Sequence, residues 1–442
     1  MATGKSSQTE YGGNIRKASR RGSLVSATLG LSDIIAGKTI QTVLASLSDR
    51  PDRALISETC FGTVRHYFSL RENLSSLLKQ PPDKLDTKVW HLLLVSAYQL
   101  RFTRVKPYAL VSEAVNAVRI LGHQSASGLV NAVLRKFEPS REATSIEATY
   151  EAPQWLIDSL IRDYPNDWQD ILKTSLTRAP LTLRINKSVI SPQEYQSLLH
   201  QDELSFTQGC VPETISLAKP IPQSDIPGIK QGYVSIQDAH SQVAARLMDL
   251  QKGLRVLDVC AAPGNKTIHM LDICSSIELN SIDKNASRSH WFFQQPKNLT
   301  RGHRISVGDG TNLAWWDGQN YDRILLDAPC SGTGTLRRNP DIKINRQSED
   351  VDGAQKSQLR LLRNVWQTLK PGGLLLYSTC SLLRSENEHV IQKFTENQAD
   401  VSINPLDISQ GIKSSWGVQL LPEAGGGDGF FYSVLKRNLQ SR

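Results

Sequence analysis

Cysteine is scarce in this sequence, and its spacing fits neither a disulfide framework nor a metal site. Six cysteines are spread over 442 residues, and no two of them form a C-x-x-C pair. This usage is typical of a reducing cytosol, where thiols stay free for chemistry. No apolar stretch approaches the ~18–20 residues of a membrane helix, and the N-terminus lacks the apolar segment of a secretory signal. We therefore expect a cytoplasmic protein with no membrane segment and no bound metal.

Acidic residues are outnumbered by basic ones, which points to a polyanionic partner. Lys and Arg total 51 against 43 Asp and Glu, so the formal net charge is +8. Such an excess favours nucleic acid as the partner. The N-terminal tail is basic and rich in serine, with Arg16, Lys17, Arg20 and Arg21 close together. We expect residues 1–23 to be disordered, either as a solvated leader or in loose contact with a polyanion.

Three segments with different patterns follow this tail, and none repeats at a solenoid period. Residues 24–140 have few interruptions by glycine or proline and repeat apolar residues at helical spacing, which predicts an all-helical domain. Residues 141–228 combine a helix after Pro153, an alternating strand at 181–186 and a proline-rich stretch, which indicates a linker and a small α+β subdomain. Residues 229–442 alternate short apolar strands with helices, so we expect a Rossmann-like α/β domain with a mostly parallel sheet.

Small and acidic residues follow the first three predicted strands of this last segment. Ligands of open parallel sheets bind beyond the carboxyl ends of the strands, and the N–H groups of the first helix there can hold the carboxylate of a methionine moiety. Asp283 can accept hydrogen bonds from ribose hydroxyls, and Asp309 can bind an adenine amino group. Each could be a simple cap or turn residue, but acceptors at successive strand ends favour a ligand site. The small-residue loop consists of Cys260, Ala261, Ala262, Pro263, Gly264, Asn265 and Lys266.

This loop is neither a G-x-G-x-x-G motif nor a Walker A motif. That difference disfavours nicotinamide and nucleoside-triphosphate ligands.

Two further strand ends carry cysteines, Cys330 after the strand at 322–327 and Cys380 after the strand at 373–378. A lone buried cysteine is usually inert, but two at the ligand edge of one sheet favour nucleophilic chemistry. One reaction that needs such a thiol is methylation of cytosine at C5. C5 is too weak a nucleophile to take a methyl group until a thiolate has added at C6. Asp327 is placed to hydrogen-bond the N3/N4 edge of the base. The spacing alone does not say which cysteine attacks.

Three motifs closely resemble those of the RNA 5-methylcytosine methyltransferase family: Val256–Gly264, Leu326–Gly334 and Tyr377–Ser381. The resemblance implies a class I methyltransferase domain with S-adenosylmethionine as the methyl donor. It implies that residues 260–266, Asp283, Asp309 and Asp327 line the pocket for this cofactor. In that family the cysteine of the Thr-Cys motif attacks C6, and the cysteine of the Pro-Cys motif assists release of the product. The resemblance therefore assigns Cys380 as nucleophile and Cys330 as helper.

The helical segment carries a second resemblance. Leu47–Leu55 and Ser127–Arg135 look like the NusB-type RNA-binding fold. A NusB-like domain joined to this catalytic domain is similar to the family's bacterial enzymes that methylate 16S rRNA. The resemblance implies 16S rRNA as partner, either free or in an assembling small ribosomal subunit, and we expect a monomer.

The sequence departs from the family pattern at two positions. Asn265 stands where the family usually has a second glycine, and Asn339 stands where a histidine is expected. If the first position needs a positive backbone angle, asparagine is the next most tolerant residue. We expect the cofactor pocket to be kept.

Basic residues near the motifs are candidates for RNA contacts. Arg135 ends a helix of the NusB-like segment, where it also suits the helix dipole. Four more follow the Pro-Cys motif, either as phosphate contacts or as a solvated loop: Arg337, Arg338, Lys343 and Arg346. The target cytosine must be unstacked to reach Cys380, so we expect an accessible loop of RNA.

Two alternatives remain open at this point. A cytosine-C5 methyltransferase acting on DNA would use Cys330 as the nucleophile, and one acting on another RNA would keep Cys380. A non-catalytic RNA-binding or antitermination factor could have kept the NusB-like fold. A methyl-transfer assay separates the enzymes from the binding protein.

Overall fold

The computed structural model describes residues 22–209, 211–285 and 303–439. They form two compact units, the first made of the described residues up to Leu176 with Leu336–Arg346, and the second of the remainder. Within these ranges no helix is long and apolar enough to cross a lipid bilayer. The tail expected over residues 1–23 lies, as far as residue 21, outside the described residues, and Ser23 already begins a helix.

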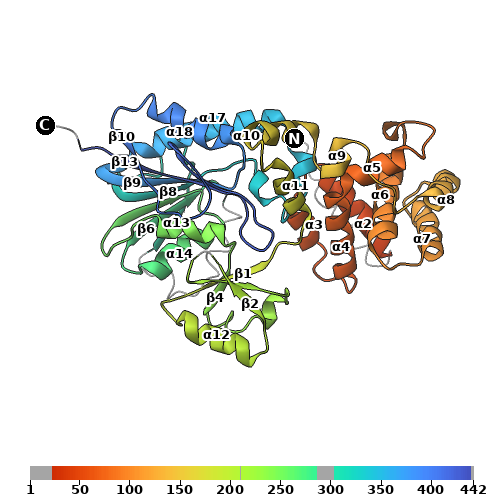
Figure 1. Ribbon diagram of the computed structural model, residues 1–442, viewed down its shortest axis with the longest axis horizontal. Coiled ribbons are helices and arrows are strands. Elements are labelled where there is room, and N and C mark those ends of the chain that lie inside the picture. Colours follow the sequence, from red (N-terminus) through yellow and green to blue (C-terminus); the bar gives the residue numbers. More distant parts are fainter. Residues whose placement is uncertain (1–21, 210, 286–302, 440–442) are drawn as a thin grey trace, which may run out of the picture. The chain divides into compact units, whose positions relative to one another are not determined.

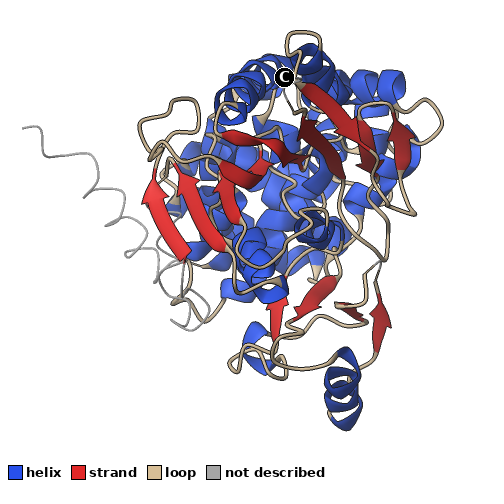
Figure 2. Cartoon of the chain, turned by 90° about the vertical axis from the view of Figure 1, so that its left-hand side faces the viewer, coloured by secondary structure: helices blue, strands red, loops and turns tan. Residues whose placement is uncertain are grey.

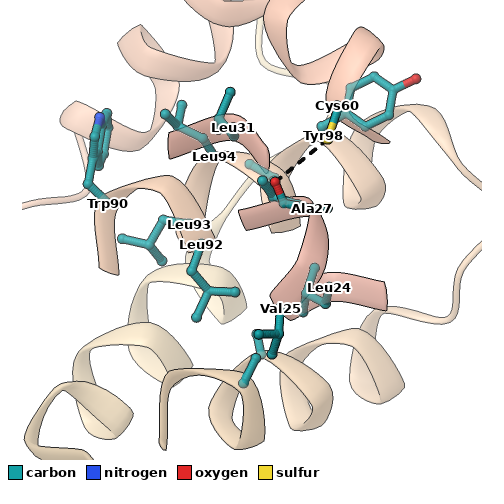
Figure 3. Packing of buried hydrophobic residues seen from close by; sticks show 14 of the residues in the cluster. Leu24, Val25, Ala27, Leu31, Cys60, Trp90, Leu92, Leu93, Leu94 and Tyr98 are labelled. Atoms are coloured by element: carbon teal, nitrogen blue, oxygen red, sulfur yellow. Dashed lines mark hydrogen bonds between the residues drawn. The ribbon is translucent and has the colours of Figure 1, made fainter. Parts of the chain in front are cut away.

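The first unit is made of helices, and several of them pack against α6 (Thr87–Phe102), which lies among them in Figure 1. Every residue of α6 from Val89 to Gln99 is buried, and a helix buried on all sides occupies the centre of a bundle. Its three consecutive leucines share one core with Leu24 and Leu31, and the Cys60 thiol donates to a carbonyl oxygen of the same core (Figure 3). The other helices are α2 (Ser23–Ile35), α3 (Ile40–Ala45), α4 (Arg53–Arg65), α5 (Tyr67–Ser75), α7 (Pro107–Ile120), α8 (Ser127–Lys136), α9 (Ile146–Tyr150), α10 (Gln154–Asp163), α11 (Trp168–Leu176) and α16 (Ile342–Asn345).

The helical unit extends further along the chain than the expected boundary at residue 140. The buried Glu151 lies just after α9 in the left-handed region, at φ +50°. Its carboxylate accepts the backbone N–H groups of Phe68 and Ser69 at 3.0 and 3.2 Å. These amides lie in the first turn of α5, where the helix itself offers them no acceptor. The interaction fastens α9 to α5, and the helices up to Leu176 group with this compact unit.

A segment from the C-terminal part also joins the helical unit. Leu336–Arg346 was expected within the methyltransferase segment, but it belongs to the first unit. Arg65 donates to the carbonyl oxygen of Arg337 at 3.2 Å, and Ile344 packs against the helical core. Burial lowers the pKa of the Lys343 ammonium to about 7. Contacts between residues about 270 positions apart fix this segment, so local sequence patterns gave no sign of them.

The second unit begins with a small antiparallel sheet in the order β2-β3-β1-β4. Its core includes Leu183, Ile185 and Ile215 from the sheet and Tyr195 from α12. This arrangement confirms the expected α+β character of the middle segment. Its elements are β1 (Leu181–Ile185), α12 (Pro192–Gln201), β2 (Phe206–Gln208), β3 (Thr214–Leu217) and β4 (Val234–Ile236).

A nine-stranded sheet forms the rest of the second unit. Its order is β11-β12-β13-β9-β8-β5-β6-β7, and β10 pairs with residues 434–437 of β13, beyond the residues that pair with β12. The five strands from β5 to β9 are parallel, whereas β13 is antiparallel to its neighbours. The mostly parallel sheet is therefore confirmed. The strands are β5 (Arg255–Val259), β6 (Glu278–Asp283), β7 (His303–Val307), β8 (Tyr321–Asp327), β9 (Leu369–Thr379), β10 (Val401–Asn404), β11 (Ile412–Ser414), β12 (Gly417–Leu420) and β13 (Phe430–Arg437).

Helices cover both faces of this sheet, whose twisted strands are visible in Figure 2. Side chains alternate between the faces of a strand. In β8, Ile324 and Leu326 share a core with residues of α17 (Ser348–Trp366) and α18 (Glu388–Thr395). Leu325 instead joins the core formed with α13 (Val243–Arg246) and α14 (Asn265–Ile273). Because both faces are covered, ligands can approach the parallel strands only at their ends.

Leu93→Ala should lower the stability of the helical unit substantially. Leu93 is fully buried in α6, so its truncation leaves a cavity and should cost about 2–5 kcal/mol in free energy of unfolding. Leu55→Ala is the control, because Leu55 is 46% exposed and should change stability within about 0.5 kcal/mol. Urea unfolding followed by circular dichroism measures both. Equal losses from the two variants would show that α6 is not the centre of the core.

Candidate active site

The two cysteines of the predicted site come together at the carboxyl ends of β8 and β9. These strands are parallel neighbours, and Asp327 is in register with Ser378. Cys330 and Cys380 follow within three and two residues of that pair. Their sulfur atoms are 3.4 Å apart, and both side chains are half-buried. The structure therefore places two partly accessible thiols within contact distance at the edge where a parallel sheet binds its ligand.

The Cys330 thiol of this pair has a raised pKa. The hydrogen bond to the Cys380 sulfur raises the pKa of Cys330 well above its usual value, and burial and the neighbouring negative charges act in the same direction. Cys330 therefore keeps its proton at neutral pH. A thiol that stays protonated is a hydrogen-bond donor to its neighbour rather than a nucleophile.

The loop after β5 forms a hollow lined by small residues. Cys260 and Gly264 have positive φ angles of 62° and 101°, and Gly264 precedes the first residue of α14. The amide of Ala262 donates to Asp283 at 3.1 Å, so the carboxylate that ends β6 faces the loop that ends β5. The N–H groups in the first turn of α14, which begins directly after Gly264, have no acceptor within the helix. The hollow is lined by Ala261, Ala262, Pro263, Gly264, Ser281, Ile282, Asp283 and Ile305.

The expected loop residues differ in what they contribute. Burial raises the pKa of the Cys260 thiol to about 12, so Cys260 contributes its backbone conformation and not a reactive thiol. Asn265 is the first residue of α14, and the positive φ falls on Gly264 before it. The position of the missing second glycine therefore does not need a left-handed backbone. Asn265 fits there without strain.

Asp309 lies beyond β7, the neighbour of β6. It is exposed, and the hydrogen bond from the backbone N–H of Thr311 at 2.8 Å lowers the pKa of its carboxyl group. The acceptors expected for a nucleoside therefore end adjacent strands, in the order that the sequence predicted.

An ion pair connects the cofactor loop to the cysteine pair. The Lys266 ammonium, at the start of α14, binds the Asp327 carboxylate at the end of β8. Ser378 donates to the same carboxylate at 3.2 Å, and the ammonium lies 5.3 Å from the centre of the Phe430 ring. Sequence reasoning selected Lys266 and Asp327 but not Ser378 or Phe430. The pairing of β8 with β9 places Ser378 beside Asp327, and the pairing of β9 with β13 places Phe430 near Lys266. No local motif encodes this strand register.

Family models match three consecutive parts of the chain. The NusB family matches residues 27–139, the RsmF/B-like ferredoxin-like domain matches residues 152–224, and the 16S rRNA methyltransferase RsmB/F family matches residues 245–436. A probable ribosomal RNA small subunit methyltransferase B from Coxiella burnetii is 37% identical over 92% of this chain and 97% of its own length. A ribosomal RNA small subunit methyltransferase B from Klebsiella pneumoniae is 36% identical over 90% of this chain and 94% of its own length. The chain belongs to the ribosomal RNA small subunit methyltransferase B family.

Solved structures agree with this fold. The crystal structure of PH0851 has a TM-score of 0.80 at 21% identity and covers 94% of this chain and 99% of that one. A methyltransferase homolog from Pyrococcus horikoshii is 26% identical with a TM-score of 0.54, and it covers 64% of this chain and 99% of its own. The NusB-like helical unit and the Rossmann-like methyltransferase domain expected from the sequence are confirmed.

The basic residues expected to contact rRNA in this methyltransferase lie in different environments. Arg135 and Arg346 are exposed, and Arg338 is half-buried. Arg337 and Lys343, however, are only 2% and 1% exposed. Both belong to the segment that packs into the helical unit, so the expectation that they contact phosphates is corrected. A phosphate contact needs the cationic group at the surface.

Gly334→Ala should disturb the cysteine site of this methyltransferase. The Gly334 amide donates to the Cys380 carbonyl oxygen at 2.8 Å. A Cβ atom at Gly334 would lie 2.1 Å from the carbonyl oxygen of Gly429 and 2.8 Å from that of Cys380. We expect a loss of about 1–3 kcal/mol in stability and slower methylation of rRNA.

The matched control is Gly353→Ala, because no atom lies within 4 Å of a Cβ there in α17. Alanine at this helical position should raise the free energy of unfolding by up to about 1 kcal/mol. Thermal unfolding and methyl transfer from a radiolabelled donor measure both variants. Unchanged stability and activity in Gly334→Ala would contradict the close approach of these loops.

Proposed function

We propose that this protein transfers a methyl group from S-adenosylmethionine to C5 of a cytosine in 16S rRNA, through a covalent bond between Cys380 and C6. The observation that carries this proposal is the pair of sulfur atoms 3.4 Å apart, beside the ion pair of Lys266 with Asp327. C5 of cytosine is too weak a nucleophile to take a methyl group directly. A thiol at the site gives the reaction a route through a covalent intermediate.

In this route the sulfur of Cys380 bonds to C6, and the electron pair displaced from the C5–C6 double bond makes C5 nucleophilic. C5 then takes the methyl group. A solvent water molecule takes the C5 proton, the electron pair of the C5–H bond re-forms the C5–C6 double bond, the C6–sulfur bond breaks, and Cys380 leaves as the thiolate with the electrons of that bond. Cys330, within contact distance of the Cys380 sulfur, assists this release: its raised pKa keeps the thiol protonated, so it can donate a hydrogen bond to the departing Cys380 thiolate.

Asp327 is the group proposed to bind the N3/N4 edge of the cytosine. Its carboxylate is one-third exposed and already accepts hydrogen bonds from Lys266 and Ser378. These donors fix its orientation, and the exposed part can accept a hydrogen bond from the exocyclic amino group. Fixing the base in one orientation relative to Cys380 is worth a large part of the rate enhancement in a two-reactant step.

The residues around the hollow beyond β5 and β6 suit the proposed cofactor. Bound S-adenosylmethionine supplies an electrophilic methyl group on a sulfonium. The first-turn amides of α14 would hold its carboxylate. Asp283 would accept the ribose hydroxyls, and Asp309 would accept the adenine amino group. The small residues of the loop, including Ala261 and Ala262, leave room for close approach of the backbone.

The substrate proposed is 16S rRNA, either free or in an assembling small ribosomal subunit, bound by a monomeric enzyme. The net charge of +8 supports a polyanionic substrate. Arg135, Arg338 and Arg346 remain proposed phosphate contacts, because each is at least partly exposed. The half-buried position of the cysteines requires the target cytosine to leave its stack.

Alanine variants of the two cysteines separate their roles. Cys380→Ala should abolish 5-methylcytosine formation, because no thiolate adds to C6. Cys330→Ala should accumulate a covalent protein–RNA adduct, because release from product is slowed. Cys274→Ala is the control, since this half-buried thiol contacts Ser276 and not the pair, and it should act as wild type. Mass spectrometry of digested 16S rRNA transcript and a denaturing gel give the two readouts.

Opposite results would favour the alternatives. Loss of both product and adduct in Cys330→Ala, with Cys380→Ala active, would identify Cys330 as the nucleophile, as in DNA-type enzymes. Binding of S-adenosylmethionine and rRNA without any methyl transfer by wild type would favour a non-catalytic RNA-binding factor.

A further inference from the structure

The buried Glu386 contacts the loops of both cysteines. It ends a short 3-10 helix, Arg384–Glu386, six residues after Cys380, and its side chain is fully buried. One carboxylate oxygen accepts the backbone N–H of Ser331 at 2.7 Å. The other accepts the hydroxyl groups of Ser331 and Ser381, each at 2.5 Å. A single carboxylate therefore holds residues from two loops that are fifty positions apart.

The two serines occupy equivalent places in the sequence. Ser331 directly follows Cys330, and Ser381 directly follows Cys380. A carboxylate that fixes both serines therefore fixes the backbone that carries each sulfur. Thr333 adds a second link, because its hydroxyl oxygen accepts the Leu382 amide at 2.9 Å.

Glu386 is itself held from other elements. Gln358 of α17 donates to it at 3.3 Å and to the Pro329 carbonyl oxygen at 2.9 Å. The Tyr377 hydroxyl donates to its backbone carbonyl oxygen at 2.7 Å. Burial raises the pKa of this carboxyl group although the serine hydroxyls oppose the shift. Burying a carboxyl group is costly unless it is hydrogen-bonded, so a role beyond packing is expected here.

We propose that Glu386 is the positioning residue of the cysteine pair, which holds Ser331 and Ser381 so that the Cys330 and Cys380 sulfurs stay within contact distance. This inference rests on the proposed function, in which both thiols act on one cytosine. Charge on Glu386 also helps to keep Cys330 protonated, since it is among the causes that raise the pKa of that thiol. Glu386 does not itself reach the base.

The first test uses the rate of disulfide formation between Cys330 and Cys380 to report how close the two thiols stay. It needs neither RNA nor cofactor. Diamide oxidises two adjacent thiols to a disulfide and is itself reduced to the hydrazine. Peptide mass spectrometry then follows the Cys330–Cys380 crosslink against time. We expect wild type and Glu386→Gln to crosslink fastest, because glutamine keeps the shape and one acceptor oxygen. Glu386→Ala and Ser331→Ala should crosslink at least about tenfold more slowly.

The matched control is Glu213→Gln, a buried carboxylate of the same unit that binds Arg246 and His269 instead. It should lose stability in thermal unfolding but keep the wild-type crosslinking rate. Slower crosslinking in this control, equal to that of Glu386→Ala, would mean that lost stability alone explains the effect and would overturn the proposal. So would a wild-type crosslinking rate in folded Glu386→Ala.

The second test uses methylation and a charge readout. Glu386→Ala should lower kcat on the order of 100-fold, as a displaced reacting group does, with KM for S-adenosylmethionine unchanged. In Glu386→Gln the loss of charge should let iodoacetamide alkylate Cys330 at lower pH than in wild type. An unchanged alkylation profile, or a change in KM alone, would contradict the positioning role. If wild type methylates no rRNA, the proposed function fails, while the crosslinking rates still decide the role of Glu386.

Discussion

The parallel pairing of β8 with β9 is the constraint on which the site depends. Asp327 is in register with Ser378, so the chain leaves both strands at the same level and at adjacent positions. Two loops that begin there must share one small volume, and the cysteines in them end 3.4 Å apart. A slip by one residue would turn the side chains of β9 to the opposite face of the sheet and would separate Ser378 from Asp327.

Around this pairing, each neighbouring strand adds one part of the site. The end of β5 contributes the small-residue loop, and β6 contributes Asp283, which accepts the Ala262 amide. The ion pair of Lys266 with Asp327 joins the cofactor side to the thiol side. Glu386 adds the last link by accepting hydrogen bonds from the residue after each cysteine. The two reactants of a methyl transfer would therefore meet between groups that are fixed before either one binds.

Much of this arrangement was predictable, because strand ends of a parallel sheet lie at one edge and the sequence marks them with Asp283, Asp309, Cys330 and Cys380. The helical first unit followed from apolar periodicity. The burial of Leu336–Arg346 within the helical unit was not predictable. Its basic residues are typical of a surface loop, whereas Arg337 and Lys343 are buried by helices distant in the sequence. The role of Glu151 was not predictable either, since the backbone amides that donate to its carboxylate are brought there by packing between elements about 80 positions apart. Local patterns encode strands, caps and motifs, but not which distant backbone amides a buried carboxylate meets.

The central claim is that Cys380 forms the covalent bond to the base. Wild-type protein would be incubated with S-adenosylmethionine and 16S rRNA transcript in which cytidine is replaced by 5-fluorocytidine. Fluorine at C5 cannot leave as the proton does, so the adduct persists after methyl transfer. Protease and nuclease digestion followed by tandem mass spectrometry then identifies the modified peptide. The account predicts a methylated fluorocytidine attached to Cys380, and the same nucleotide attached to Cys330 would contradict it.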